Sequence, residues 1–171
     1  MNPNMTPLPP GYTHVQHTFE PVFDEHSRIL ILGSFPSVKS RENQFYYGHP
    51  QNRFWRLMAR LLNVPVPQSI DEKKTMLLTH GLALWDVIAS CDIKGSSDSS
   101  IKNVKPTELR KILDASNIKQ IYANGSKAGQ LYKKYQLPLT GMEAVVLPST
   151  SPANAAWSLE RLCEAWRKIK C

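Results

Sequence analysis

A ten-residue segment combines aromatic rings, cations and an amide at a density that a simple connection does not require. Residues 46–55 read Tyr-Tyr-Gly-His-Pro-Gln-Asn-Arg-Phe-Trp. Aromatic faces stack on nucleobases, and arginine pairs with phosphate. The amide of Asn52 can bind water or substrate. Asn52 also precedes a helical apolar stripe, where an asparagine cap contributes about 1 kcal/mol. Taken alone, Asn52 favours the cap, although one side chain can serve both roles.

Three short loops rich in glycine and hydroxyl groups each follow an apolar run. They are Gly33–Ser37, Asn124–Lys127 and Pro148–Ala155. Free N–H groups and hydroxyls in such loops can hydrogen-bond a base or a phosphate. Each loop is equally typical of an ordinary turn or helix start. Asp86, beside Trp85, is a carboxylate in apolar surroundings, which predicts an ion-pair partner, a ligand or a raised pKa.

Several cofactor signatures are absent from the sequence. It contains neither a Walker A loop nor a Gly-x-Gly-x-x-Gly motif, and its three cysteines show no Cys-x-x-Cys spacing. No histidine pair has the spacing of metal ligands on a helix. We therefore expect no metal or organic cofactor, and surface or capping roles for the histidines at positions 14, 17, 26, 49 and 80.

The elements that must position these residues alternate along the chain. Apolar runs predict strands at 28–33, 81–88, 118–123 and 144–147. Apolar periodicity and caps predict helices at 54–62 and 69–80, from about 109, from Ser126 to about 135, and from an N-cap at Ser151 onwards. This alternation predicts an α/β fold, a three-layer α/β/α sandwich with about four parallel strands. Ligands bind beyond the carboxyl ends of such strands.

Length and charge limit the class of protein. The 171 residues suit one domain, which we place at 28–171 after a proline-rich N-terminal arm at 1–27 that is laid over the domain or partly free. The net charge of +7 and the pI of about 9.4 favour a polyanionic partner. No run is long enough for a membrane span, and residues 1–11 lack the pattern of a secretory signal. We expect a monomer in the cytoplasm.

The order of these motifs resembles the uracil-DNA glycosylase superfamily, and most nearly its hypoxanthine (deoxyinosine) branch, family 6. Gly33–Ser37 stands at the first motif, a glycine, two variable residues and a proline. His49–Trp55 is similar to the aromatic segment of the mismatch-specific uracil glycosylases. Gly125-Ser126 and Pro148–Asn154 resemble the third-strand loop and the last motif, which enters the DNA duplex. The resemblance implies a superfamily-like sandwich and a cofactor-independent enzyme that acts on single- or double-stranded DNA.

Two departures from the superfamily pattern favour a purine substrate. Phe35 stands where members that remove uracil carry a water-positioning aspartate or asparagine, a role that the hypoxanthine branch gives to the asparagine matching Asn52. Ser149 stands where a histidine often stabilises the leaving base. The resemblance implies that Asn52 is catalytic and holds the attacking water through its oxygen, while its NH₂ group can touch the substrate. Ser34, Phe35, Phe54, Asp86 and Ser149 would form the base pocket, with Phe54 stacked on the flipped base.

The remaining site residues would contact DNA and fill the gap left by the flipped nucleotide. They are Ser37, Gly125, Ser126, Lys127, Ser149, Thr150, Ser151, Pro152, Ala153 and Asn154. The implied reaction is hydrolysis of the N-glycosidic bond of deoxyinosine, which releases hypoxanthine and leaves an abasic site. Three alternatives remain open: release of uracil or xanthine instead, a non-catalytic DNA-binding module on the same fold, and an enzyme acting on small molecules.

Overall fold

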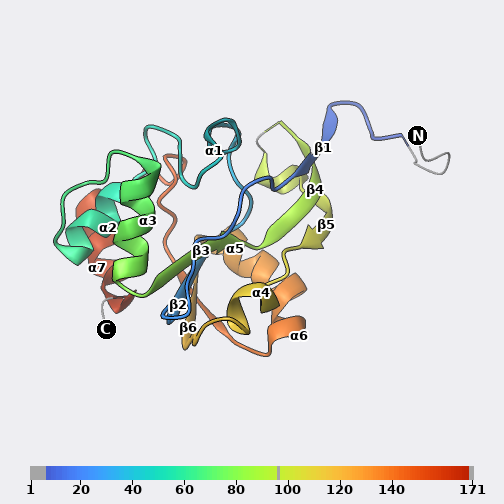
Figure 1. Ribbon diagram of the computed structural model, residues 1–171. Helices are drawn as coiled ribbons and strands as arrows, with labels where there is room; N and C mark the ends of the chain where they lie inside the picture. Colours follow the sequence, from blue (N-terminus) through green and yellow to red (C-terminus); the bar gives the residue numbers. More distant parts are fainter. Residues whose placement is uncertain (1–6, 96, 170–171) are drawn as a thin grey trace.

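A four-stranded parallel sheet forms the centre of the molecule (Figure 1). The computed structural model describes residues 7–95 and 97–169, so the first six residues of the predicted arm lie outside it. The strands run in the order β3 (Leu82–Asp86), β2 (Ile29–Gly33), β6 (Gln120–Asn124) and β7 (Ala144–Leu147). Every neighbouring pair is parallel. The four predicted strands and the three-layer α/β/α class are confirmed.

Alternating side chains of β2 supply both hydrophobic cores. Ile29 and Ile31 pack with α2 (Phe54–Leu62), α3 (Ile70–Thr79) and α7 (Leu159–Trp166) on one face of the sheet. Leu30 and Leu32 pack on the other face, with α4 (Arg110–Leu113) and the end of α5 (Ser126–Leu131). A strand buried on both faces therefore needs an unbroken apolar run, as the sequence has at this position.

A second, antiparallel sheet was not predicted. Its order is β1 (Tyr12–Gln16), β4 (Ile88–Lys94) and β5 (Lys102–Pro106). The first strand of the chain is therefore Tyr12–Gln16 rather than the strand beginning near residue 28. Tyr, Thr and Val in this segment favour a strand, and that signal could have located it. Its pairing with β4, from Tyr12↔Lys94 to Gln16↔Ser90, joins distant segments that no local pattern indicates.

Most helix starts agree with the sequence, with one exception. The Ser69 hydroxyl caps α3 by accepting a hydrogen bond from the Glu72 N–H. Helix α5 continues through a π-helical turn, Tyr132–Gln136, into α6 (Leu137–Thr140). The predicted N-cap at Ser151 is wrong, because α7 begins at Leu159 with Ser158 as its cap. The remaining short elements are α1 (Val38–Asn43) and single turns at Asp98–Ser100 and Arg167–Ile169.

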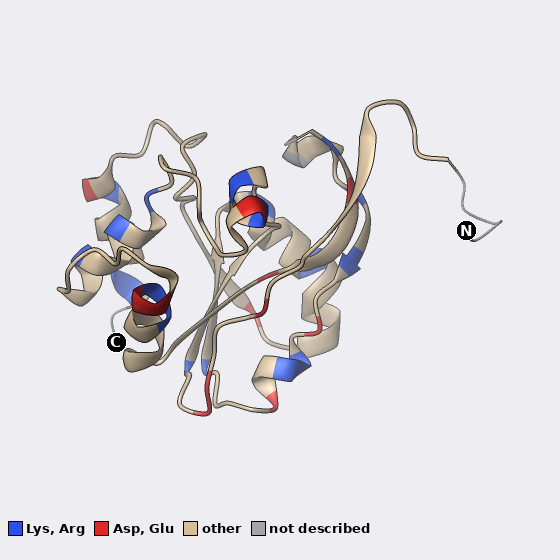
Figure 2. Cartoon of the chain, turned by 45° about the horizontal axis from the view of Figure 1, so that its top comes forward, with Lys and Arg blue, Asp and Glu red and all other residues tan. Residues whose placement is uncertain are grey.

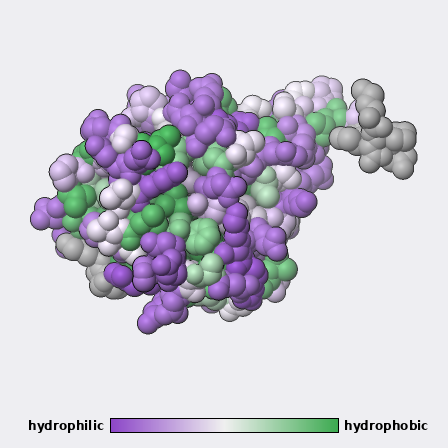
Figure 3. Space-filling model, in the orientation of Figure 1, coloured by the Kyte–Doolittle hydropathy of each residue, from purple (hydrophilic) through white to green (hydrophobic). Residues whose placement is uncertain are grey.

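Charged residues lie mainly outside the central sheet. Figure 2 shows lysine and arginine on the helices and on the antiparallel sheet, whereas the parallel strands are uncharged along most of their length. Hydrophilic side chains cover most of the face shown in Figure 3. None of the helices in the described part of the chain has the length and apolar character needed to cross a membrane.

Candidate active site

A cleft of about 880 Å³ opens at the carboxyl ends of the parallel strands. The loops after β2, β6 and β7 line it, together with Asn52 from the segment before α2 and Asp86 from the end of β3. The structure thus brings together residues that are up to about 120 positions apart in the sequence. The predicted residues that line the cleft are Ser34, Phe35, Ser37, Asn52, Asp86, Gly125, Ser126, Lys127, Ser149, Thr150, Ser151, Pro152, Ala153 and Asn154.

Phe54 is the one predicted site residue that the structure does not bring to the cleft. Its side chain is fully buried, and its ring packs edge to face with Trp55 and Trp166. Tyr47 lines the cleft instead, and its ring stacks on Phe54 at 4.2 Å between centroids. Phe54 faces the core because it opens the apolar stripe of α2. Tyr47 belongs to the aromatic segment 46–55 that the sequence indicated, but the prediction assigned the stacking role to Phe54; Tyr47 adopts a φ of 53°.

A relay of three side chains fixes the amide of Asn52. The Thr150 N–H donates to Asn124 Oδ1 (3.1 Å), so the Asn124 Nδ2 group faces the Thr150 hydroxyl and donates to it (3.0 Å). The Phe54 N–H donates to Asn52 Oδ1 (3.0 Å), which leaves the Thr150 hydroxyl to donate to the same oxygen (2.9 Å). Two backbone N–H groups therefore determine the direction of every bond in the relay.

This arrangement limits what Asn52 can offer a substrate. Its Oδ1 already accepts two hydrogen bonds, the ordinary capacity of a carbonyl oxygen. Its Nδ2 group makes no hydrogen bond to any described residue, so the free polar group of Asn52 is a donor. The predicted water-holding role of the oxygen would require one of these bonds to break. Asn52 also caps the start of α2 through the Phe54 N–H, as the sequence suggested.

Thr150 positions other residues rather than contacting DNA. Its side chain is fully buried, and its hydroxyl and N–H are both engaged in the relay. The predicted DNA contact through its hydroxyl is therefore not available, because the end of β6 and the start of α2 enclose it.

Replacing Thr150 by valine is expected to lower both stability and activity. Valine has the shape of threonine but leaves the buried Asn124 Nδ2 group without an acceptor, which costs about 1–3 kcal/mol. Asn52 would lose one of its two anchors, and we expect about a tenfold slower reaction. Thermal unfolding and single-turnover rates measure the two effects. Thr150→Ser keeps the hydroxyl and serves as the control; equal losses in both variants would contradict the relay.

The loop between β7 and α7 is held by a single arginine. The guanidinium of Arg53 donates to the carbonyls of Ser151 (2.9 Å) and Asn154 (3.1 Å), and also to those of Thr150 and Trp157. Two of these carbonyls also accept turn hydrogen bonds within the loop, that of Ser151 from the Asn154 N–H (2.9 Å) and that of Asn154 from the Trp157 N–H (3.2 Å). The loop is further closed by the Asn154 amide, which donates to the Ser149 carbonyl (3.0 Å). A rigid loop therefore borders the cleft.

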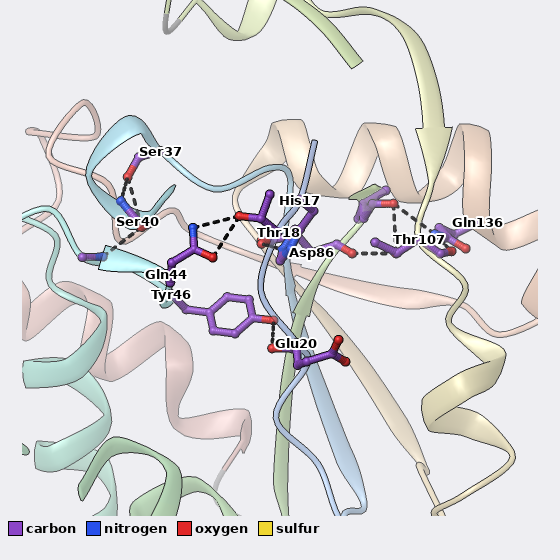
Figure 4. A network of polar contacts seen from close by, with 12 residues as sticks. His17, Thr18, Glu20, Ser37, Ser40, Gln44, Tyr46, Asp86, Thr107 and Gln136 are labelled. Carbon is purple, nitrogen blue, oxygen red and sulfur yellow. Dashed lines mark hydrogen bonds and ion pairs between the residues drawn. The ribbon is translucent and has the colours of Figure 1, made fainter. Parts of the chain in front are cut away.

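Asp86 has the partner that its sequence context required. His17 Nε2 lies 2.8 Å from Asp86 Oδ2, and both side chains are at most 5% exposed (Figure 4). The predicted surface or capping role is wrong for His17, because pairing of β1 with β4 carries it into the protein. His80 does cap α3, and His26 is exposed.

Gly33, which has no side chain, leaves room for the carboxyl group of Asp86 beside the cleft. A Cβ atom at Gly33 would lie 2.4 Å from Asp86 Oδ1 and 3.1 Å from the Tyr47 hydroxyl oxygen. Any other residue at position 33 would displace these groups. The Tyr47 hydroxyl is buried and lacks a hydrogen-bond partner among the described residues. Burial and the nearby Asp86 carboxylate raise the pKa of Tyr47, while the Asn124 amide opposes them, so the hydroxyl stays protonated at neutral pH.

The cationic rim of the cleft includes a residue that the sequence analysis missed. Arg41 of α1 lines the cleft with its guanidinium 5.7 Å from the centre of the Phe35 ring, and its Nε has no hydrogen-bond partner in the described part of the chain. Its place just after the first motif was the available signal. Ser37 caps α1 through the Ser40 N–H, which occupies its hydroxyl. Lys127 adds a second cation from α5. The described residues contain no cluster suited to a metal ion.

The fold and the cleft identify the class of protein. A family model of the uracil DNA glycosylase superfamily matches residues 20–170, and the chain belongs to this superfamily. A protein of Methanosarcina acetivorans named hypoxanthine DNA glycosylase is 37% identical over 159 residues, which cover 91% of this chain and 98% of that protein. One of the same name from Methanosarcina barkeri is 37% identical over 139 residues, 80% of this chain and 86% of the relative.

The comparison of structures agrees with the family. A solution NMR structure from Methanosarcina acetivorans, described as a candidate uracil DNA glycosylase, superposes with a TM-score of 0.72. It is 34% identical in sequence and covers 90% of this chain and 97% of the other.

Proposed function

We propose that this protein is a monofunctional DNA glycosylase that releases hypoxanthine from deoxyinosine and leaves an abasic site. The observation that carries the proposal is the placement of Asn52, fixed by the relay, in a cleft that also holds Asp86. Relatives named hypoxanthine DNA glycosylase that align with most of this chain support the choice of base. Phe35, at the position where uracil-releasing members carry a polar residue, supports a purine substrate.

The mechanism follows from the groups that face the cleft. Hydrolysis of an N-glycosidic bond passes through an oxocarbenium-like state in which negative charge grows on the departing base, so fixed hydrogen-bond donors can lower the barrier. The Nδ2 group of Asn52 is such a donor. It can hold the oxygen of the attacking water or a ring nitrogen of the departing base. The rigid relay behind it keeps the donor in place during the reaction.

The rest of the site would hold the extruded nucleotide. The ring of Tyr47, rather than that of Phe54, offers a surface to the base, and Phe35 closes the pocket beside Ser34, Asp86 and Ser149. Arg41 and Lys127 would pair with phosphates next to the lesion, with Gly125 and Ser126 close by. The 151–154 segment would occupy the space left in the duplex. Deaminated adenine pairs poorly with its partner base, which lowers the cost of flipping it.

Single-turnover assays on duplexes containing deoxyinosine, deoxyuridine or deoxyxanthosine test the proposal. We expect fastest release from deoxyinosine. We also expect binding to weaken by about one order of magnitude or more between 50 and 200 mM salt, because phosphate contacts release counterions. Faster release of uracil would show that uracil, not hypoxanthine, is the preferred base. Binding of DNA without release of any base would show that the protein is a DNA-binding module and not an enzyme. Turnover of free nucleosides would contradict an action on DNA.

A further inference from the structure

We propose that the Tyr47 hydroxyl and Asp86 Oδ1 together recognise the lactam edge of the flipped base, a ring N–H beside a carbonyl, and that His17 positions Asp86 for this purpose. The inference rests on the proposed function and defines the chemical class of base that the site accepts. Deamination of adenine or cytosine converts an amino group beside a bare ring nitrogen into this lactam pattern.

The Tyr47 hydroxyl is a donor without an acceptor. It is buried, protonated at neutral pH and unpaired among the described residues, and Tyr47 is one of the residues that line the cleft. Buried polar groups without partners are costly and uncommon in native proteins. Its position beside Gly33, which also lines the cleft, places it where a carbonyl oxygen of a bound base would complete its bonding.

Asp86 supplies the complementary acceptor. Its Oδ2 is occupied by His17, and its backbone carbonyl accepts from the Thr107 hydroxyl at 2.7 Å (Figure 4). These two contacts fix the carboxyl group and leave Oδ1 directed at Gly33, within reach of the same point as the Tyr47 hydroxyl. One donor and one acceptor therefore approach the first-motif glycine together.

This pair matches deaminated bases and opposes adenine and cytosine. Hypoxanthine presents N1–H and O6, and uracil presents N3–H and O4, so each can satisfy both groups. Adenine and cytosine present a lone pair to Asp86 and an amino group to Tyr47, which leaves two buried polar groups mispaired. Guanine has the same lactam edge, so these two groups do not exclude it. Guanine is instead disfavoured because flipping it requires breaking its pair with cytosine.

His17 enters the site from outside the matched family region. It directly follows β1, whereas the family model begins at residue 20. Its N–H donates to the Ala89 carbonyl (2.7 Å), and its ring packs against Phe19 at 4.4 Å and Tyr46 at 5.9 Å. A donor on Asp86 Oδ2 also offsets the carboxylate charge, which would otherwise repel the negative charge that grows on the departing base. His17 is thus a positioning residue.

The test compares release of hypoxanthine and of 1-methylhypoxanthine, which lacks the N1–H, from otherwise identical duplexes. We expect the wild type to favour hypoxanthine at least about 100-fold. Tyr47→Phe removes only the unpaired hydroxyl. Its melting temperature should therefore be unchanged or higher, whereas its release of hypoxanthine should fall about tenfold. Asp86→Asn should bring the preference for hypoxanthine close to one.

Variants at His17 separate positioning from packing. Gln can place its Nε2 donor where that of histidine lies, so His17→Gln should restore most of the preference, and His17→Phe should lose it. Tyr132→Phe is the matched control. It removes a hydroxyl bonded to the Met142 carbonyl in the second core, so it should lower the melting temperature without changing base preference.

Each outcome bears on a different statement. Equal release of both bases by the wild type, an unchanged preference in Asp86→Asn, or full wild-type release of hypoxanthine by Tyr47→Phe would overturn lactam recognition and leave the proposed function intact. A wild type that releases neither hypoxanthine nor its methyl derivative would instead remove the proposed function. His17→Phe with the full wild-type preference would exclude the positioning role.

Discussion

Asn52→Asp is expected to lose base release as completely as Asn52→Ala, by about 100- to 1,000-fold, the range for removal of a preorganised transition-state donor. Aspartate keeps the oxygen that accepts from Phe54 and Thr150 but places a second oxygen where the free Nδ2 group lies. A carboxylate there cannot donate, and its charge would repel a departing anion. Single-turnover release of hypoxanthine from duplex DNA measures the loss.

The aspartate variant also separates the catalytic role from the helix cap. A carboxylate at the start of α2 still accepts from the Phe54 N–H and suits the helix dipole, so its melting temperature should match or exceed that of the wild type. Asn52→Ala should lower it, because the cap contributes about 1 kcal/mol. Retained activity in Asn52→Asp would mean that an oxygen, not the amide nitrogen, acts on water or substrate, and would contradict the donor assignment.

Arg53→Ala is expected to release the loop at 148–157 and to slow hypoxanthine release from duplex DNA by about 100-fold. The guanidinium binds four carbonyls of this loop, and each hydrogen bond to a charged group contributes about 1.5–3 kcal/mol. Lysine has a single ammonium group that cannot reach the same set, so Arg53→Lys should lose nearly as much. Hydrogen exchange of residues 148–157 reports the loss of order directly.

A surface arginine provides the control for Arg53. Arg60, also on α2, pairs with Glu160 at 3.5 Å, and both side chains are more than half exposed. Pairs of this kind contribute about 0–1 kcal/mol, so Arg60→Lys should leave exchange and activity unchanged. Wild-type protection of the loop in Arg53→Ala would show that other contacts order it.

The tertiary structure confirmed where most predicted site residues lie but changed the roles of several of them. Most predicted site residues line one cleft because β-α units bring the ends of parallel strands together. The order of the motifs along the chain was therefore enough to predict that they share a site. The residue at the cleft that can stack on a base is Tyr47 and not the predicted Phe54, and the apolar stripe of α2 could not indicate this. Thr150 changed from a DNA contact to a link in the relay, since its hydroxyl meets Asn52 across 98 positions.

The sequence by itself determined the parallel sheet, the helices at α2 and α3, and the place of Asn52 before an apolar stripe, because these depend on neighbouring residues. Only the tertiary structure decided which end of the Asn52 amide is free, that Arg53 binds four carbonyls of the loop before α7, and that His17 reaches Asp86 from 69 positions away. These features depend on hydrogen bonds between distant segments. Such bonds exist only after the segments that carry them have packed together.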